Sequence, residues 1–314
     1  MYDAVVVGGG PAGLSAAGWL GRYRRRVVVL DGGEHRNRWV EHSHGYLSRD
    51  DADPKELLRL AREQVTAYPT VELRSGRASS ARRSDDGTFV VESAAGPVQA
   101  RRVVLATGVR DAFPEVERFF DHYGADVFHC PTCDGYEAQG CEVVAFGWSS
   151  HVAGFALTLL EWAASVTVVT DGSRFEGDER CRQALERHAV DVLEDEAVEL
   201  IGTRGDLRGV RLRGGAVLPC QLAFFSIAHH PRTDLAVELG CGLTEEGCVE
   251  VDHEGLTSVA GVYAAGDVTP GMQLVQVAAA KGTVAGVACA LSLQGEPPAP
   301  GAPAPGPDVA SELS

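Results

Sequence analysis

The feature that most constrains this chain is a strand–helix–strand unit that occurs twice. Residues 2–7 form a short apolar run that ends in glycine, a helical pattern covers 14–23, and a second apolar run covers 27–31. Short, continuously apolar strands bounded by glycine are typical of a parallel sheet that is buried on both faces. Residues 142–171 repeat this order, with a helical stretch to Ala164. Two such βαβ units predict an α/β fold with two domains that share the same nucleotide-binding type of fold.

Three glycines between the first strand and its helix indicate a dinucleotide site. Gly8 permits a tight turn, Gly10 lets a pyrophosphate approach the backbone, and Gly13 lets the helix pack closely on the strand. The positive end of the helix would then meet the phosphates. Asp31 follows at the end of the second strand and can accept a ribose hydroxyl. The alternative, glycines that serve only a tight turn, is disfavoured by this strand-to-helix context.

The second copy keeps the βαβ order but loses most of the glycine pattern. Its aligned positions are Gly147, Ser149 and Val152. Serine allows a moderately close approach, whereas valine adds bulk where the helix has to lie near the strand. Asp171 would repel a 2′-phosphate, and Arg174 is the one cation nearby. Both domains are therefore predicted to be Rossmann-like, the second poorly suited to NADPH or NADH.

The remaining segments predict how the two domains are joined. Further helices are expected at about 53–68 and 274–293, and further strands at 70–80, 87–93, 97–105 and 262–267. We expect the second domain, 116–246, to be inserted into the first, formed by 1–115 and 247–294. The last segment, 295–314, contains six prolines and no periodicity, which is typical of a disordered tail.

Cys130 and Cys133 carry the sharpest chemical signal. Two thiols separated by two residues can close a small disulfide, and this spacing often lowers a thiolate pKa to ~7 or below. Asp134 follows directly and can transfer a proton during exchange. His129 precedes the pair and can stabilise a thiolate, or be a hydrogen-bonded structural histidine. Zinc would need another close pair, and the other six cysteines are scattered and suit buried apolar positions, so no metal site is predicted.

Charge and composition exclude several classes of protein. The 314 residues include 28 basic and 44 acidic side chains, a net charge of -16, which argues against nucleic acid as a partner. No apolar run reaches the ~18 residues of a membrane span. The chain opens directly into a strand, which leaves no room for a secretory signal, so a cytoplasmic location is expected. Eight cysteines are too few for a disulfide scaffold.

Four motifs in order resemble the low-molecular-weight thioredoxin reductase family over about residues 1–293. They are Gly8-Gly9-Gly10-Pro11-Ala12-Gly13, Ala106-Thr107-Gly108, Cys130-Pro131-Thr132-Cys133-Asp134-Gly135 and Ala264-Ala265-Gly266-Asp267. The resemblance implies FAD bound by the first and last parts of the chain, with the redox cysteines on the inserted domain. The FAD-binding positions would be Gly8, Gly10, Pro11, Ala12, Gly13, Asp31, Asn37, Ala106, Thr107, Gly108, Gly266, Asp267 and Gln276.

The resemblance also implies roles for the redox residues. Cys133 would face the flavin, Cys130 would exchange with the substrate thiol or disulfide, and Asp134 matches the family's acid. A homodimer and a thioredoxin-like or small-molecule dithiol or disulfide partner are expected on the same ground.

Other stretches are similar to an offshoot of the family that includes small-molecule dithiol oxidases of the gliotoxin and holomycin type, which use FAD and molecular oxygen. These stretches are Arg36-Asn37, residues 44–50 and Gly135-Tyr136-Glu137, whereas Asp134 matches the reductases. Three functions stay open: a reductase with an unusual electron donor such as ferredoxin or a second flavin, a dithiol oxidase, and a flavin-binding redox sensor. The intact cysteine pair and acid favour the two enzymes over the redox sensor. The net negative charge of the chain disfavours binding of acidic ferredoxin.

Overall fold

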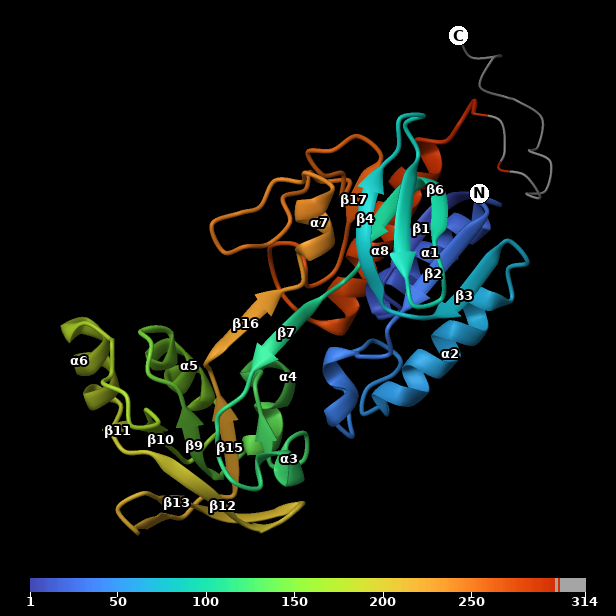
Figure 1. Ribbon diagram of the computed structural model, residues 1–314. Coiled ribbons are helices and arrows are strands. Elements are labelled where there is room, and N and C mark those ends of the chain that lie inside the picture. The colour runs from blue at the N-terminus through green and yellow to red at the C-terminus, as the bar shows by residue number, and fades with distance from the viewer. Residues whose placement is uncertain (297–298, 300–314) are drawn as a thin grey trace. The chain divides into compact units, whose positions relative to one another are not determined.

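The computed structural model describes residues 1–296 and 299, which form two compact units (Figure 1). Unit 1 consists of residues 1–38, 55–110 and the described residues from 230 onward. Unit 2 consists of residues 39–54 and 111–229. Each unit contains a sheet in which parallel strands are joined by βαβ connections, which confirms the predicted α/β fold with two Rossmann-like domains.

The sheet of unit 1 is built around a strand that is buried along its whole length, β1 (Tyr2–Val7). The strand order is β3 (Val71–Ser75), β2 (Val27–Asp31), β1, β6 (Val98–Leu105), β5 (Phe89–Ser93) and β4 (Ala78–Arg83), with β17 (Val262–Ala264) beside the end of β6. β1, β2, β3, β6 and β17 are parallel, and the β4–β5–β6 pairings are antiparallel. The predicted strand at 70–80 is thus two strands.

The two faces of this sheet pack against different elements (Figure 1). The helices of unit 1 are α1 (Pro11–Arg22), α2 (Pro54–Thr66), α7 (Asp234–Glu238) and α8 (Val275–Leu291). Ala4 and Val6 of β1 pack with α1, α2 and α8, whereas Val5 and Val7 pack with α7 and β5. α1 and α8 lie backbone against backbone, since a Cβ on Gly282 would stand 2.0 Å from the carbonyl oxygen of Ala12.

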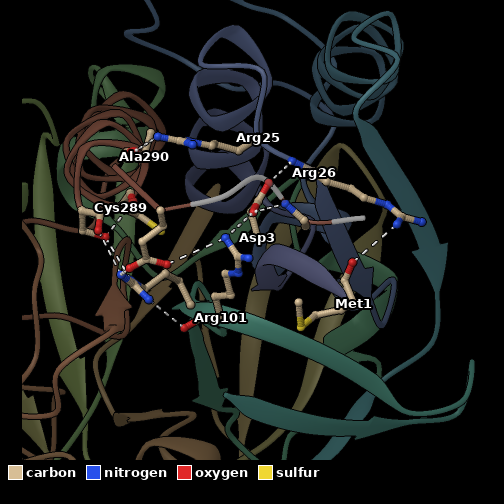
Figure 2. A network of polar contacts seen from close by, with 11 residues as sticks. Met1, Asp3, Arg25, Arg26, Arg101, Cys289 and Ala290 are labelled. Atoms are coloured by element: carbon tan, nitrogen blue, oxygen red, sulfur yellow. Dashed lines mark hydrogen bonds and ion pairs between the residues drawn. The ribbon is translucent and has the colours of Figure 1, made fainter. Parts of the chain in front are cut away.

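A polar network around Asp3 ties the start of β1 to the chain beyond α8 (Figure 2). The Asp3 side chain is 1% exposed, and its Oδ2 accepts from the backbone N–H of Arg26 at 2.8 Å. Its Oδ1 accepts from the N–H of Ala299 at 3.2 Å and lies 3.5 Å from Arg101 Nη1. Glu296 pairs with both Arg101 and Arg102. Glu296 and Ala299 belong to the segment predicted as a disordered tail, 295–314, and both are held by these contacts. Residues 297–298 and 300–314 lie outside the described residues.

Unit 2 contains a five-stranded parallel sheet and a small antiparallel one. The parallel order is β11 (Asp191–Leu193), β10 (Ser165–Val169), β9 (Glu142–Phe146), β15 (Leu222–Phe225) and β8 (Val127–Phe128); the antiparallel order is β12 (Ala197–Thr203), β13 (Asp206–Leu212) and β14 (Val217–Leu218). The helices of this unit are α3 (Phe119–His122), α4 (Pro131–Asp134), α5 (His151–Leu159) and α6 (Glu179–Arg187), with a 3₁₀ turn η2 (Tyr136–Ala138). Three short elements each contain a point where the chain passes from one unit to the other: η1 (Arg36–Trp39), β7 (Val109–Ala112) and β16 (Ala228–Pro231). β7 and β16 form a two-stranded sheet.

The units divide the chain differently from the predicted boundaries at 115/116 and 246/247. Residues 230–246 belong to unit 1 because Leu235, Ala236 and Cys241 lie in its core. Residues 39–54 belong to unit 2, where the Trp39 ring lies 5.1 Å from that of Phe120. Both assignments depend on contacts between residues far apart in the sequence.

Candidate active site

In unit 1, the predicted cofactor residues gather at the carboxyl ends of β1 and β6. From β1 the chain turns outward to β2 and β3 on one side, while β6 and β17 lie on the other, and ligands bind at such a switch point. Gly8 follows β1 with φ +115°, and a Cβ there would stand 2.1 Å from the Ala106 carbonyl oxygen after β6. The structure therefore brings the glycine turn and residues 106–108 together.

The N-terminus of α1 has the features of an anion-binding site. Gly10 is the N-cap, Pro11 follows at the first helical position, and no side chain caps the helix. A Cβ on Gly10 would meet nothing within 4 Å, whereas one on Gly13 would stand 1.8 Å from the Gly8 carbonyl oxygen. Gly13 thus lets the helix approach the turn, and the position beside the Gly10 backbone is open. This arrangement fits the pyrophosphate of a dinucleotide such as FAD.

Asp31, the last residue of β2, already has two partners. Its Oδ1 accepts from the N–H of Gly33 at 2.8 Å and its Oδ2 from Arg62 at 2.7 Å. Arg62 also lies 2.7 Å from His35 Nε2, which has to accept because guanidinium only donates. Burial lowers the pKa of His35, in agreement with a neutral ring. A carboxylate offers about four acceptor positions, so Asp31 keeps capacity for a ribose hydroxyl.

The last part of the chain contributes Gly266 and Asp267, which follow the end of β17 after Ala265. A Cβ on Gly266 would stand 2.8 Å from the Ala12 Cβ in α1, so this turn adjoins the glycine turn. Asp267 Oδ2 pairs with Arg36 Nη1 at 3.2 Å, and Arg36 also donates to Gln273 Oε1 at 2.6 Å. The other predicted positions are Asn37, beside Arg36 in η1, Thr107, whose hydroxyl donates to the Arg232 carbonyl at 2.7 Å, Gly108, at φ +68°, and Gln276, in the first turn of α8.

In unit 2, the equivalent switch point lies between β9 and β15. A Cβ on Gly147 would stand 2.9 Å from Val152 Cγ2, and Val152 is fully buried. Because Val152 carries a side chain, α5 cannot approach Gly147 as α1 approaches Gly8. Asp171 lies in a turn at φ +53°, and burial, reinforced by Glu196, raises its pKa. Arg174 lines an open hollow of about 460 Å³ together with Trp148, Phe175 and Arg182.

The Cys130–Cys133 pair forms a disulfide in unit 2. Cys130 is the N-cap of α4, with Pro131 at its first position. The N–H of Cys133 lies 3.1 Å from the Cys130 Sγ, and the N–H of Asp134 donates to the Cys130 carbonyl at 3.0 Å. In the reduced pair, the first contact would stabilise a thiolate on Cys130.

Asp134 is buried next to this disulfide. Burial, with a smaller contribution from the charge of Glu137, raises the pKa of Asp134 to about 7. A carboxyl group that titrates near neutrality is suited to general acid–base catalysis. Glu137 in turn lies 3.4 Å from His44 Nε2, so residues 39–54 adjoin the redox motif.

His129 is held by aromatic side chains. Its Nδ1 lies 3.1 Å from the Tyr123 hydroxyl, and its ring lies 5.9 Å from that of Phe225. These contacts fix the ring directly before Cys130 and define its orientation. Its predicted catalytic role remains a prediction.

Other features of the sequence lie away from these residues. Cys220, Cys241, Cys248 and Cys289 are buried as expected, whereas Cys141 and Cys181 are half-buried and pack against the core of unit 2. Among residues 1–296 and 299, no three His, Cys, Asp or Glu side chains are grouped to hold a metal ion. Within the same residues, no helix combines the length and apolar composition needed to cross a bilayer.

A dinucleotide turn on one unit and a redox disulfide with a buried acid on the other define an FAD-dependent disulfide oxidoreductase. The model of the pyridine nucleotide-disulphide oxidoreductase family matches residues 2–282, and the chain belongs to that family. It is 31% identical to thioredoxin reductase sirT of Leptosphaeria maculans, covering 91% of this chain and 92% of that protein. The crystal structure of HlmI matches with a TM-score of 0.89 at 34% identity, covering 99% of this chain and 95% of that one.

Thioredoxin reductase aclD of Aspergillus oryzae is a further relative, 30% identical over 91% of this chain and 95% of its own length. The predicted kinship with low-molecular-weight thioredoxin reductases is confirmed by these matches.

Sequence reasoning missed three polar partners in the site. Arg36 holds Asp267, Arg62 holds Asp31, and His44 reaches Glu137. Arg62 could have been found, because it shares one face of α2 with the buried Leu58 and Val65, where a charge requires a partner. The other two contacts join segments with no local pattern that links them.

Proposed function

We propose that this protein is a thiol–disulfide oxidoreductase that moves electrons between FAD, the Cys130–Cys133 pair and an external dithiol or disulfide, without ordinary use of NADPH. The observation that carries the proposal is the contrast between the two switch points. Gly13 leaves α1 free to approach its turn, whereas the buried side chain of Val152 keeps α5 away from Gly147. A dinucleotide is therefore favoured in unit 1 and disfavoured in unit 2.

The chemistry of the pair can be written step by step for a dithiol substrate. A substrate thiolate attacks the Cys130 sulfur, the Cys130–Cys133 bond breaks, and its electron pair leaves on Cys133. The second substrate thiol loses its proton, attacks its neighbouring sulfur and expels Cys130 as a thiolate. The substrate departs as a disulfide, and the pair has gained two electrons. Bound FAD supplies the two-electron acceptor that reoxidises the pair.

In these steps, this chain's residues handle the protons and hold the reacting atoms. The N–H of Cys133 is 3.1 Å from the Cys130 Sγ and stabilises the thiolate that forms there. Asp134, whose pKa burial raises to about 7, takes up or returns a proton beside Cys133. Gly10, the α1 end and Asp31 would hold the FAD pyrophosphate and ribose. We propose that Cys133 faces the flavin and that Cys130 meets the substrate.

A second candidate, an oxygen-dependent small-molecule dithiol oxidase, is favoured by one contact. The stretches that resemble such oxidases, 44–50 and 135–137, are far apart in the sequence, and His44 and Glu137 meet at 3.4 Å. In that reaction, oxygen would accept two electrons and two protons and leave as hydrogen peroxide.

Anaerobic mixing of the flavin-loaded protein with NADPH, NADH and a small dithiol, in turn, tests these functions by flavin absorbance. We expect bleaching by the dithiol; recovery in air with peroxide release would favour the oxidase. Millisecond bleaching by NADPH would refute impaired nicotinamide use. If none of the three bleaches the flavin, a ferredoxin-linked reductase or a redox sensor is the better description. Homodimerisation and a thioredoxin-like partner are separate expectations, testable by light scattering and by coupled thioredoxin reduction.

The Cys133→Ser variant tests the electron path directly. We expect it to retain FAD but to lose flavin bleaching by dithiol, because the sulfur that would face the flavin is gone. Cys141→Ser, which removes a half-buried cysteine outside the pair, is the matched control and should bleach normally. Loss of FAD from Cys133→Ser would instead give the cysteine a structural role.

A further inference from the structure

The loop between β17 and α8, which carries the predicted FAD-binding residues Gly266 and Asp267, is held by a lysine outside the predicted site. Lys281 lies in the second turn of α8 and directs its amine at two consecutive carbonyl groups of the loop. Its Nζ donates to the Pro270 oxygen at 2.8 Å and to the Thr269 oxygen at 3.4 Å. Lys281 thus fastens the loop to the helix that follows it.

The loop cannot satisfy these two carbonyls with its own neighbouring donors. Pro270 has no N–H. The N–H of Thr269 already donates to the Gly266 carbonyl at 3.0 Å, and the Thr269 hydroxyl donates to the same oxygen at 2.7 Å. Thr269 is 2% exposed, and a polar backbone group withdrawn from water is costly without a partner. Lys281 supplies the donor that this stretch lacks.

The position of Lys281 on α8 links the loop to the glycine turn. Gly282, the next residue, is where α8 meets α1, since a Cβ there would stand 2.0 Å from the Ala12 carbonyl oxygen. The start of the loop adjoins the same residue, because a Cβ on Gly266 would stand 2.8 Å from the Ala12 Cβ. Consecutive residues of α8 therefore contact two segments of the predicted FAD site.

We propose that Lys281 is a positioning residue of the FAD site: by holding the carbonyls of Thr269 and Pro270 it fixes the loop that presents Asp267, and so keeps the site in the shape that binds FAD. The inference rests on the use of FAD proposed above. Lys281 acts through the loop and not on the cofactor itself, and all the contacts that carry the inference lie within unit 1.

The expected effect follows from how many loop conformations compete with the one that binds. Methionine at position 281 has a similar length but donates no hydrogen bond. Without the two bonds, the loop would populate other conformations, and FAD would bind only the fraction in which Asp267 is in place. The apparent dissociation constant rises as that fraction falls. Two lost hydrogen bonds are expected to lower the fraction by about 10- to 100-fold.

Dilution of the flavin-loaded protein, followed by the fluorescence of released FAD, measures the dissociation constant. We expect Lys281→Met to raise it by about 10- to 100-fold. Lys281→Arg keeps several donors at the end of a long side chain and should stay within about 3-fold of wild type. Lys55→Met removes the other lysine of the chain, which is exposed in α2, and is the matched control that should bind FAD as wild type does.

Two further measurements separate a held loop from other roles. Hydrogen exchange in the full chain stripped of flavin should be about 10- to 100-fold faster in Lys281→Met across residues 265–274 and unchanged in β1, whereas a general loss of stability would accelerate both. The ratio of the variant and wild-type dissociation constants should be the same between about 0.1 and 0.5 M salt. Direct attraction between Lys281 and the FAD phosphates would instead be screened.

Three results would overturn the proposal: an unchanged dissociation constant in Lys281→Met, a rise without faster exchange in the loop, and a ratio that falls toward one at high salt. If Lys281→Met fails to fold, Lys281→Gln takes its place. Its shorter amide cannot reach both carbonyls and should raise the dissociation constant by about 3- to 10-fold, and no rise would again refute the role.

The exchange measurement does not depend on the cofactor. A wild-type protein that binds no FAD would refute the proposed function. Faster exchange of the loop in Lys281→Met would still support its attachment through Lys281, and unchanged exchange would refute it.

Discussion

The close packing of α1 on α8 makes a sharp prediction for Gly282→Ala. In an exposed helix interior this change would stabilise by about 1 kcal/mol, because alanine is the better helix former. At Gly282, however, the new Cβ would stand 2.0 Å from the oxygen, 2.7 Å from the carbon and 2.8 Å from the Cα of Ala12. Relief needs a shift of about 1 Å between two backbones, since nonbonded carbon and oxygen rarely approach within ~3 Å.

Overpacking of this kind costs about 1–3 kcal/mol, and rigid backbone places it at the upper end. With the gain in helix propensity subtracted, we expect a net loss of about 2 kcal/mol, or roughly 4–8 °C in melting temperature. Because the displaced residue, Ala12, belongs to the predicted FAD-binding turn, the variant should also release flavin at lower temperature.

Circular dichroism and flavin fluorescence, recorded during heating of the flavin-loaded protein, measure the two effects. Gly18→Ala is the matched control in α1: its Cβ would meet only Val65 Cγ1 at 3.5 Å, an ordinary contact, so this variant should melt at or above the wild-type temperature. If Gly282→Ala also melts at the wild-type temperature and keeps its flavin, the backbone contact between α1 and α8 is wrong.

Two other predictions concern buried carboxyl groups. Burial raises the folded pKa of Asp134 to about 7, so its contribution to stability is complete below about pH 4 and is lost as the pH rises through 7. The stability advantage of Asp134→Asn over wild type should therefore be about 2–3 kcal/mol larger at pH 8 than at pH 5. Urea unfolding at each pH measures this difference, and a difference that does not change with pH would contradict the raised pKa. Asp3→Ala removes the partner of Arg101 and of two backbone N–H groups and should lower the free energy of unfolding by about 3 kcal/mol or more. The control Glu92→Ala, at a solvent-accessible strand position, should change it by less than about 0.5 kcal/mol. Equal unfolding midpoints for the two variants would contradict the burial of Asp3.

The sequence predicted best those parts of the fold in which local sterics leave few choices. The turn from Gly8 to Gly13 is an example, because a Cβ on either glycine would overlap backbone atoms and the pattern is visible in the residues themselves. The first turn of α1 was harder to predict. The helix begins at Pro11, three residues before the predicted start. Pro11, Ala12 and Gly13 show no apolar periodicity, so the pattern did not reveal this turn.

Other boundaries depend on long-range partners and could not be predicted. The helix expected to reach Ala164 ends at Leu159, because the Trp162 carbonyl accepts from the N–H of Gly140 and the N–H of Ala164 donates to the Cys141 carbonyl. Similarly, the segment that contains His44 has no pattern that assigns it to unit 2. Its place depends on contacts such as that between Glu41 and Arg204, whose side chains meet at 2.7 Å.

The second unit shows that the fold and its ligand site have separate physical requirements. A βαβ unit needs a buried apolar strand and a helix that packs on it. Val152, in α5, meets the second demand because it is buried and fills the space beside Gly147. Phosphate binding needs the opposite at that position, an absent side chain that lets the helix end advance. A chain can therefore lose the nucleotide turn of this unit and keep its core. For this reason the repeated βαβ pattern predicts the fold of unit 2 well, and the three residues at its turn, Gly147, Ser149 and Val152, are what bear on its ligand.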